Sequence, residues 1–423
     1  MGFQTGLSGL NASSKNLDVI GNNIANANTV GMKTSRAEFA DIVASSISAG
    51  GGGNNAGIGV TVAAITQQFA QGNVTITGNS LDVAINGGGF FQVTKTDGST
   101  AYTRYGQFKL DKEGNLITNT GAALMGYATD AVGEAIGTSP QALTLPTTAP
   151  IDAKPTALVT AEFNLDARAK DSAQAIAAGQ TADPRSKYGT SITVFDQQGV
   201  PTAVSLYFEK TVGTPNTWDV YPDTNLASAA LGQITFDTTG KISGPLLGGI
   251  GPDFGLSFPA GTIVSDNPNE STGFLPQAID VNLNGATQYG VTFAVSNLSQ
   301  DGYTSGEFTG LNIDEKGVIT TSYSNGQTLK TGGMIALADF RNVQGLAAIG
   351  AGEYLETFAS GPTVLGKPTV GRFGELRSGA VEESNVDLTA ELVNMMTAQR
   401  NYQANAQTIK TQDQVMSTLV NLR

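Results

Sequence analysis

The chain has 423 residues, a formal net charge of -13, and neither cysteine nor histidine. This composition excludes disulfides, thiolate or imidazole catalysis and the usual zinc or copper sites, so we expect no catalytic residue, no metal and no cofactor. The acidic balance argues against a nucleic-acid partner, and no stretch approaches the roughly 20 apolar residues that cross a bilayer, so no membrane insertion is expected.

The length allows two to four domains, each large enough for its own core. The chain contains 53 Gly and 15 Pro, with few aromatic residues, which predicts many turns and short strands between the two ends. The ends differ from the acidic middle: residues 1–40 carry three basic and two acidic groups, and residues 384–423 carry three of each. Nearly neutral ends repel one another little, so they are free to associate. The first residues also lack the basic and apolar regions of a cleavable secretory signal.

Residues 3–26 are expected to form an amphipathic helix. Apolar side chains recur there at spacings of three and four, which places them on one helical face. The segment 26–31 (NANTVG) then favours a turn, because Asn and Thr side chains compete for backbone partners and Gly31 can take a positive φ. The apolar positions are Phe3, Leu7, Leu10, Leu17, Ile20 and Ile24.

A second, longer helix is predicted at the other end, where no Gly or Pro occurs between Val381 and Arg423. Ser384 or Asn385 is expected to cap it, with Asp387 near its positive end. Steps of four and three residues predict a largely apolar seam along one face. The seam consists of Leu388, Leu392, Met395, Gln399, Tyr402, Ala406, Ile409, Asp413, Met416 and Val420.

Two arrangements of these helices are open. They can pair with each other against the globular body of one chain, or pack between copies of the chain. Gln399 and Asp413 suit a wet interface between subunits better than a monomer core, and therefore favour the second arrangement.

Four segments of the middle share one pattern: an apolar run, an Asp, two further residues and a Gly. The Asp can accept from turn amides and the Gly can adopt the left-handed conformation, so each segment predicts a β-hairpin. Calcium loops are excluded, because the alternating oxygen ligands and terminal Glu of an EF-hand are missing. The pairs are Asp111 with Gly114, Asp196 with Gly199, Asp237 with Gly240, and Asp314 with Gly317.

The expected fold has mainly β central domains, of sandwich or barrel type, flanked by long N- and C-terminal helices in a coiled-coil-like terminal domain. Glycine-rich residues 50–59 predict a flexible connector, and three prolines in residues 143–156 predict a linker. Discontinuous, nested domains follow, with a return near residues 282–288. They are a terminal helical polymerisation domain (1–33 plus 384–423), an extended connector (34–70 plus 361–383), an inner β domain (71–146 plus 286–360) and an inserted outer β domain (147–285).

Both ends and two interior segments carry recognisable patterns. They are LDVIGNNIAN (17–26) with GMK (31–33), LDVAI (81–85) with GFF (89–91), YTRYGQF (102–108), and the run from SNVDL (384–388) through AQRNYQAN (398–405) to TIKTQD (408–413). These segments resemble the bacterial flagellar rod and hook protein family, over roughly residues 1–127 and 288–423. Two features resemble the hook proteins more than the rod proteins of this family: the tripeptide Phe39-Ala40-Asp41, and an insertion of about 140 residues. A distal rod or hook-associated junction protein is the alternative, and a secreted carbohydrate-active enzyme using two carboxylates is a third possibility.

The resemblance implies a structural, non-enzymatic subunit of the flagellar hook and basal body. Such a subunit leaves the cell through the flagellar type III export apparatus and is added to a homopolymer beneath a hook cap protein. Terminal helices form the inner tube, and the β domains point outward. The tube is a flexible universal joint that carries torque from rod to filament, so the distal rod protein and a hook-associated junction protein are further expected partners.

The subunit contacts are expected at both terminal helices. For the Asn residues two roles are open: local turn formation, and hydrogen bonds across subunits in addition. The expected interface residues are Leu7, Leu10, Leu17, Asn22, Asn23, Ile24, Asn26, Leu388, Leu392, Met395, Tyr402 and Ile409.

Overall fold

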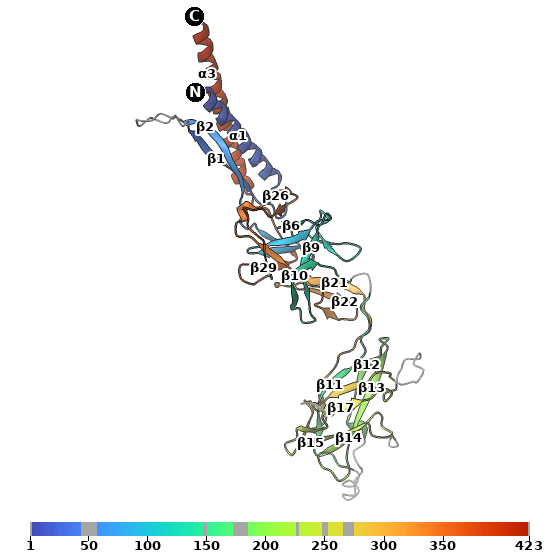
Figure 1. Cartoon of the computed structure of the whole chain (residues 1–423). Coiled ribbons are helices and arrows are strands. Elements are labelled where there is room, and N and C mark those ends of the chain that lie inside the picture. Colours follow the sequence, from blue (N-terminus) through green and yellow to red (C-terminus); the bar gives the residue numbers. More distant parts are fainter. Residues whose placement is uncertain are drawn as a thin grey trace. The chain divides into compact units, whose positions relative to one another are not determined.

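The computed structural model is mainly β, with one helix at each end of the chain, as predicted (Figure 1). It describes residues 2–43, 57–146, 150–171, 185–225, 228–247, 253–264 and 275–421. Most of the predicted connector 50–59 lies outside the described residues. The chain divides into two compact units: unit 1 contains Met1–Thr148, Thr309–Ser322 and Thr328–Arg423, and unit 2 contains Ala149–Phe308 and Tyr323–Gln327.

The helices α1 (Gly2–Ala25) and α3 (Leu388–Asn421) lie side by side in unit 1 (Figure 1). At 1.5 Å per residue, the 34 residues of α3 extend roughly 51 Å. Small residues of α1 allow the close approach. A Cβ atom added to Gly9 would lie 2.9 Å from the amide of Asn405, and one added to Gly6 would lie 3.1 Å from Ile409. The helices therefore pair within one chain, which is the first of the two arrangements above.

The N-cap of α3 is Asp387, and not Ser384 or Asn385 as predicted. The Asp387 carboxylate accepts from the backbone N–H groups of Thr389 at 2.8 Å and Ala390 at 3.1 Å. An ionised cap also interacts favourably with the positive end of the helix dipole. Asn385 is used elsewhere, as described below.

The strands β1 (Ser35–Val43) and β2 (Gly57–Gln67) form an antiparallel hairpin that packs against α1. The Ser8 hydroxyl of α1 accepts from the backbone N–H of Val60 at 3.3 Å. Part of the predicted connector 34–70 is thus a hairpin with its own side-chain partners.

The β domain of unit 1 is built on one large sheet with two hydrophobic clusters. The larger cluster includes Phe91, Val93, Leu124 and Ile335, and the smaller packs Phe69 and Phe90 edge-on against Tyr354. The sheet runs β26 (Ala347–Gly350), β27 (Glu353–Leu355), β6 (Thr100–Thr103), β5 (Phe90–Thr94), β9 (Ala123–Thr129), β8 (Leu116–Ile117), β7 (Lys109–Leu110), with β10 (Ala135–Ala142), β24 (Met334–Ile335), β25 (Leu337–Asp339) and β28 (Val364–Gly366) attached.

Smaller sheets complete this domain and correct the predicted connector 361–383. Its residues supply β28 to the large sheet, and two further strands that pair with the segment following the β1–β2 hairpin. The connector prediction was wrong there, because short strands between turns were not recognised. The pairs are β4 (Val83–Asn86) with β29 (Glu375–Ser378), and β3 (Val74–Ile76) with β30 (Ala380–Glu382); β21 (Phe308–Ile313), β22 (Ile319–Tyr323) and β23 (Thr328–Leu329) form a third sheet.

Unit 2 consists of two five-stranded sheets that share one core. Trp218, Phe163 and Phe208 are buried in this core, and the last two rings lie 4.7 Å apart. One sheet orders β12 (Gly189–Phe195), β13 (Pro201–Lys210), β14 (Thr217–Tyr221), β15 (Gly232–Phe236) and β16 (Ile242–Gly244). The other orders β17 (Gly255–Phe258), β18 (Ile279–Asn282), β11 (Leu158–Asp166) and β19 (Thr287–Tyr289), with β20 (Ala294–Gln300) paired to β11.

The predicted end of the insertion at residue 285 is wrong. β19 and β20 follow that residue and both pair with β11, so the inserted unit continues to Phe308. The sequence showed no Pro-rich linker on the return path, which left this boundary without a local signal.

The four Asp turns are confirmed as hairpin connections, and the sequence pattern missed a fifth. Asp237 Oδ1 accepts from the backbone N–H of Lys241 at 2.9 Å, and Gly240 has a φ of 84°. The fifth turn has the same spacing, with Asp130 accepting from the N–H groups of Gly133 and Glu134. At each turn the Asp side chain thus accepts the hydrogen bond that a backbone carbonyl would otherwise accept from the N–H four residues later.

These turns predict acid sensitivity. The Lys241 amide, with the Thr239 hydroxyl, holds the pKa of Asp237 below its ordinary value. A carboxylate with a depressed folded pKa stabilises the fold above its unfolded pKa of about 4, and this contribution is lost as pH falls through the folded pKa. Asp237→Asn should therefore flatten the decline in urea stability of unit 2 below about pH 4, read from the fluorescence of Trp218, the one tryptophan of the chain.

The matched control is Asp152→Asn, at an exposed position of the same unit. It should retain the decline of the wild type. An unchanged decline in Asp237→Asn would contradict the role of this carboxylate.

Candidate assembly interface

A buried ion cluster joins the two ends of the chain at the base of the terminal helices. Glu382, the last residue of β30, accepts from Lys33 Nζ at 2.5 Å and from Arg104 Nη1 at 3.0 Å. It also accepts from the backbone N–H of Gly72 at 2.9 Å. The Lys33 and Glu382 side chains are each 1% exposed, and that of Arg104 is 7% exposed. Lys33 ends the pattern at residues 31–33, and Glu382 lies two residues before the C-terminal pattern that begins at Ser384, so the segments that carry these patterns meet inside one chain.

Two cations and one carboxylate share this cluster, and two backbone carbonyls accept further hydrogen bonds from the cations, while the buried Arg104 Nε has no partner among the described residues. Lys33 Nζ donates to the carbonyl of Ala70 and Arg104 Nη2 to that of Gly87, each at 2.8 Å. Burial lowers the pKa of Lys33, while the neighbouring Glu382 carboxylate raises it less. The lysine charge therefore depends on Glu382.

Asn385 adds a second link between the ends. Its Oδ1 accepts from the backbone N–H and the hydroxyl of Thr34, both at 2.7 Å, and its Nδ2 donates to the carbonyl of Gln68 at 2.8 Å. The backbone N–H of Gly31 also donates to the Glu382 carbonyl at 2.7 Å. The start of α3 is thus held directly by the segment that follows α1.

Removing the carboxylate charge should loosen unit 1 selectively. Glu382→Gln leaves the two buried cations without a counter-ion, which costs about 3–5 kcal/mol. We expect the urea transition seen by far-UV circular dichroism to split, with the unit 1 component at lower urea and the Trp218 transition of unit 2 unchanged.

Glu383→Gln is the matched control, because Glu383 is the adjacent residue and is exposed. Its transition should lie within about 0.5 kcal/mol of the wild type. Equal stability of the two variants would rule out the proposed importance of the cluster.

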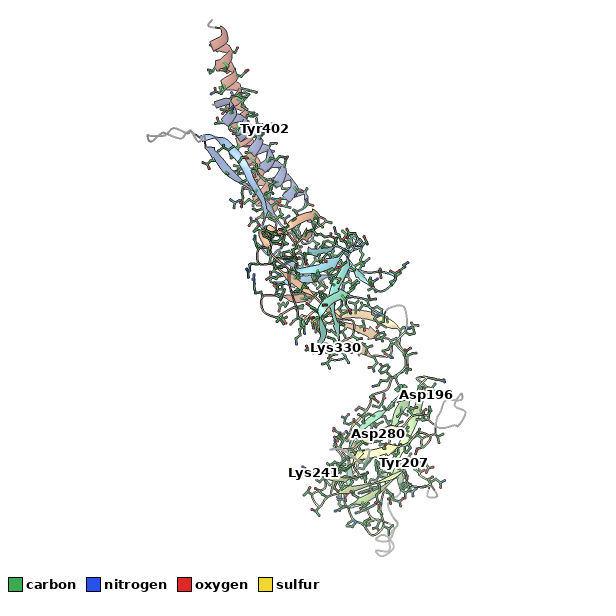
Figure 2. All side chains as sticks on the ribbon, viewed as in Figure 1. Asp196, Tyr207, Lys241, Asp280, Lys330 and Tyr402 are labelled. Carbon is green, nitrogen blue, oxygen red and sulfur yellow. The ribbon has the colours of Figure 1, made fainter. Side chains whose placement is uncertain are left out.

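The predicted seam of α3 is partly buried and partly exposed in the single chain. Met395 and Ile409 are half-buried, and belong with the buried Ala398 to a stripe at spacings of three and four that faces α1. Ala406 of the seam is also half-buried, while the seam residues exposed in the single chain are Leu388, Leu392, Gln399, Tyr402, Asp413 and Met416. The exposed large apolar side chains of α3 are Leu388, Leu392, Val393, Met396, Tyr402, Val415 and Met416; Tyr402 is labelled in Figure 2.

This exposed apolar set is unusual for a helix that already has a partner. Leu392 is 50% exposed and Met396 is 52% exposed, one turn apart on the same face. In a monomeric protein, an amphipathic helix usually turns such residues toward the protein core. Leu388, Leu392 and Met396, at successive spacings of four, therefore form a candidate surface for another molecule, which we call the α3 stripe.

On α1 the predicted residues are distributed similarly. Leu7 is exposed, while Leu10, Leu17 and Ile24 are half-buried. The residues that α1 buries most deeply are instead Ala12, Val19, Ile20 and Asn23. Of these only Ile20 belonged to the predicted apolar face; Val19 would have been found by including the β1–β2 hairpin as a second packing partner.

The three Asn residues make local hydrogen bonds. Asn23, 1% exposed, donates to the Ser35 carbonyl at 2.8 Å and accepts from the Ser35 N–H at 2.9 Å. These bonds hold the start of β1 against α1, and a bond of Asn23 across subunits stays a prediction. Asn26 donates to the carbonyl and side chain of Asn22, and both residues line a pocket that opens to solvent.

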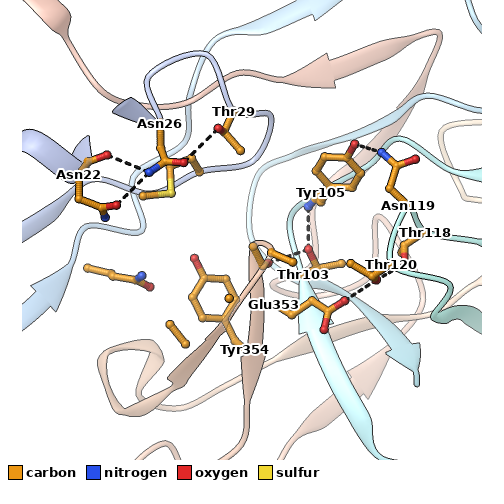
Figure 3. Close-up of a pocket in the computed structure, with 16 residues that line it drawn as sticks. Asn22, Asn26, Thr29, Thr103, Tyr105, Thr118, Asn119, Thr120, Glu353 and Tyr354 are labelled. Carbon is orange, nitrogen blue, oxygen red and sulfur yellow. Dashed lines mark hydrogen bonds between the residues drawn. The ribbon is translucent and has the colours of Figure 1, made fainter. Parts of the chain in front are cut away.

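That pocket has a volume of about 460 Å³ and lies between the end of α1 and the β domain of unit 1 (Figure 3). Tyr105, Tyr354 and Met32 contribute apolar parts of its wall. Ala348 of β26 also lines the pocket and is exposed to solvent. Glu353 is the one charged residue of the lining. It is paired with Lys95 at 3.0 Å and accepts from the Thr120 hydroxyl, so the pocket carries no unpaired charge.

The described residues contain no group of three or more Asp or Glu side chains arranged to hold a metal ion. Within the same residues, no helix is both long and apolar enough to cross a membrane.

Four family models match the chain in register with these structural parts. The flagella basal body rod protein model matches residues 3–33, and the FlgE/F/G D1 domain model of the flagellar hook protein matches 84–158. The FlaE D2 domain model matches 164–303, and the FlgEFG C-terminal model of the basal body rod matches 377–422. The D2 match ends at residue 303, beyond the predicted boundary at 285.

Relatives that align over the full length of the chain are flagellar hook proteins. The flagellar hook protein FlgE of Salmonella typhimurium is 40% identical over 440 aligned residues, which cover 100% of both chains. The FlgE proteins of Escherichia coli K12, 40% identical with the same coverage, and of Treponema pallidum, 33% identical over 99% of this chain and 98% of the relative, agree. The chain belongs to the flagellar hook protein family. It is a structural subunit of the bacterial flagellar hook.

A solved structure supports the fold of this hook subunit. The crystal structure of the Helicobacter pylori flagellar hook protein FlgE2 matches with a TM-score of 0.50 and 15% identity, over 73% of this chain and 100% of that one. At this identity the match concerns the fold alone.

Proposed function

We propose that this hook subunit polymerises with copies of itself into a flexible tube, the universal joint that transmits torque from the rod to the filament. In this proposal α1 and α3 pack in a coiled-coil-like manner between copies and form the inner wall. The acidic β domains lie outside. Type III export would deliver the chain, and a hook cap protein, the distal rod protein and a hook-associated junction protein would be its neighbours. We infer no enzymatic role.

The α3 stripe is the observation that carries this proposal. It leaves several large apolar side chains in water on a helix whose other face already packs on α1. Burying such a side chain contributes about 1.5–3 kcal/mol, so a stripe of them supplies a strong drive for association. A long helix with one intramolecular and one intermolecular face suits the wall of a tube.

The proposed domain arrangement follows from the same division. The terminal segments 1–33 and 384–423 form the polymerisation domain, the inner β domain connects to it through the ion cluster, and unit 2 is the inserted outer domain. The proposed contacts are Leu7, Leu10, Leu17, Asn22, Asn23, Ile24, Asn26, Leu388, Leu392, Met395, Tyr402 and Ile409, of which the exposed ones should contribute most. Half-buried Met395 and Ile409 would contribute through the shape of the helix pair.

A charge placed in the α3 stripe should block assembly. Leu392→Glu would bury an unpaired carboxylate at the interface, so the concentration needed for polymerisation should rise at least about tenfold. Sedimentation of purified protein over a concentration series measures this threshold. Trp218 fluorescence confirms that unit 2 is folded.

Gln407→Glu is the matched control, since it adds the same charge at an exposed polar position of the same helix. It should polymerise at nearly the wild-type concentration. If Leu392→Glu behaves like this control, the stripe is not the assembly surface.

A further inference from the structure

One apolar side chain of unit 1 stands entirely in solvent on a rigid support. Phe358 lies in the loop between β27 and β28, and its exposure equals or exceeds that of a free extended chain, at 103%. A surface phenylalanine usually lays its ring against neighbouring side chains. Here the whole ring is available for contact.

The turn that carries Phe358 is fixed by its own side chains. The Thr357 hydroxyl accepts from the Ala359 N–H at 3.1 Å, and the Ser360 hydroxyl donates to the Thr357 carbonyl at 2.8 Å. Ser360 itself is 1% exposed. The apex is exposed, therefore, while the residues on both sides of it are bonded into the domain.

A second loop, at residues 342–345, forms hydrogen bonds with this turn. Asn342 Nδ2 donates to the Ala359 carbonyl at 3.0 Å, and the Thr357 hydroxyl donates to the Gly345 carbonyl at 2.5 Å. A Cβ atom added to Gly345 would lie 2.4 Å from the Ser360 nitrogen, so only glycine permits this approach. The support reduces the entropy that Phe358 would lose on binding, which is the property of an anchor residue.

We propose that Phe358 of one copy inserts into the pocket beside Tyr105 and Tyr354 of a second copy. This inference rests on the proposed homopolymer. A chain that carries both a protruding apolar group and a separate hollow associates head to tail, which is the contact type that builds open helical polymers. Because Phe358 is fully exposed, it does not occupy the pocket of its own chain.

The pocket suits an uncharged aromatic guest in size and in charge. Its volume of about 460 Å³ exceeds that of a benzyl group, and its single carboxylate, Glu353, is already paired with Lys95. Asn22 and Asn26 lie at its wall (Figure 3). Insertion would therefore place a neighbour's turn against the end of α1, and would give these two amides the partner across subunits that their sequence pattern suggested.

The absence of native cysteine makes this contact directly testable. The variants Phe358→Cys and Ala348→Cys, each carrying one thiol, are mixed in equal amounts, polymerised and treated with a short bismaleimide. A crosslinked dimer that joins positions 358 and 348, identified by mass spectrometry, is the expected result. Polymers of Phe358→Cys mixed with Val132→Cys, an exposed site of the same unit, should give no such dimer.

Phe358→Ala tests the energetic role. It should raise the polymerisation threshold about tenfold or more, the equivalent of one buried aromatic side chain, without changing the melting temperature of the monomer. Val132→Ala, which trims another exposed apolar residue, should leave the threshold unchanged. Polymers that form normally from Phe358→Ala, or that lack the 358–348 crosslink, would overturn the anchor while leaving the homopolymer intact. Failure of the wild type to polymerise would instead contradict the proposed function.

Discussion

The buried carboxylate of Glu382 is the interaction on which unit 1 depends. It binds the lysine that follows α1, the arginine that follows β6 and the backbone of the segment preceding β3. Burying charges costs several kcal/mol per ion, and this cost is recovered only when all partners are in place. The base of each terminal helix is therefore stable only in the presence of the other, although 349 residues separate Lys33 from Glu382. This arrangement makes the two ends a single folding element.

The helices that emerge from this base have two faces with different chemistry. Small residues of α1 bring Asn405 and Ile409 close, so the pairing of α1 and α3 uses little apolar surface. Leu388, Leu392 and Met396 remain exposed along a line at spacings of four on α3. Such a division suits a subunit of the hook, because the pair is preformed within each copy and the larger hydrophobic gain is reserved for assembly.

Unit 2 is stabilised by its own turns and by one aromatic core. Its hairpins are closed by Asp side chains that bond the turn amides, and its sheets enclose Trp218. Neither device involves the terminal helices. An insertion of this type can vary without disturbing the ion cluster, and its acidic surface disfavours non-specific association between outer domains.

The terminal helices, the β-rich middle, the Asp turns and the family could be predicted from the sequence alone. They depend on periodicity, turn chemistry and signature residues, which are local properties of the chain. The sequence could not determine which face of α3 is inward: Met395 and Leu392 are equally apolar, and only the position of α1 separates them. Nor could it show that Asn23 pins β1, that β20 returns to β11, or that Lys33 meets Glu382. These features join residues far apart in the chain, and pairings of that kind are decided by tertiary packing.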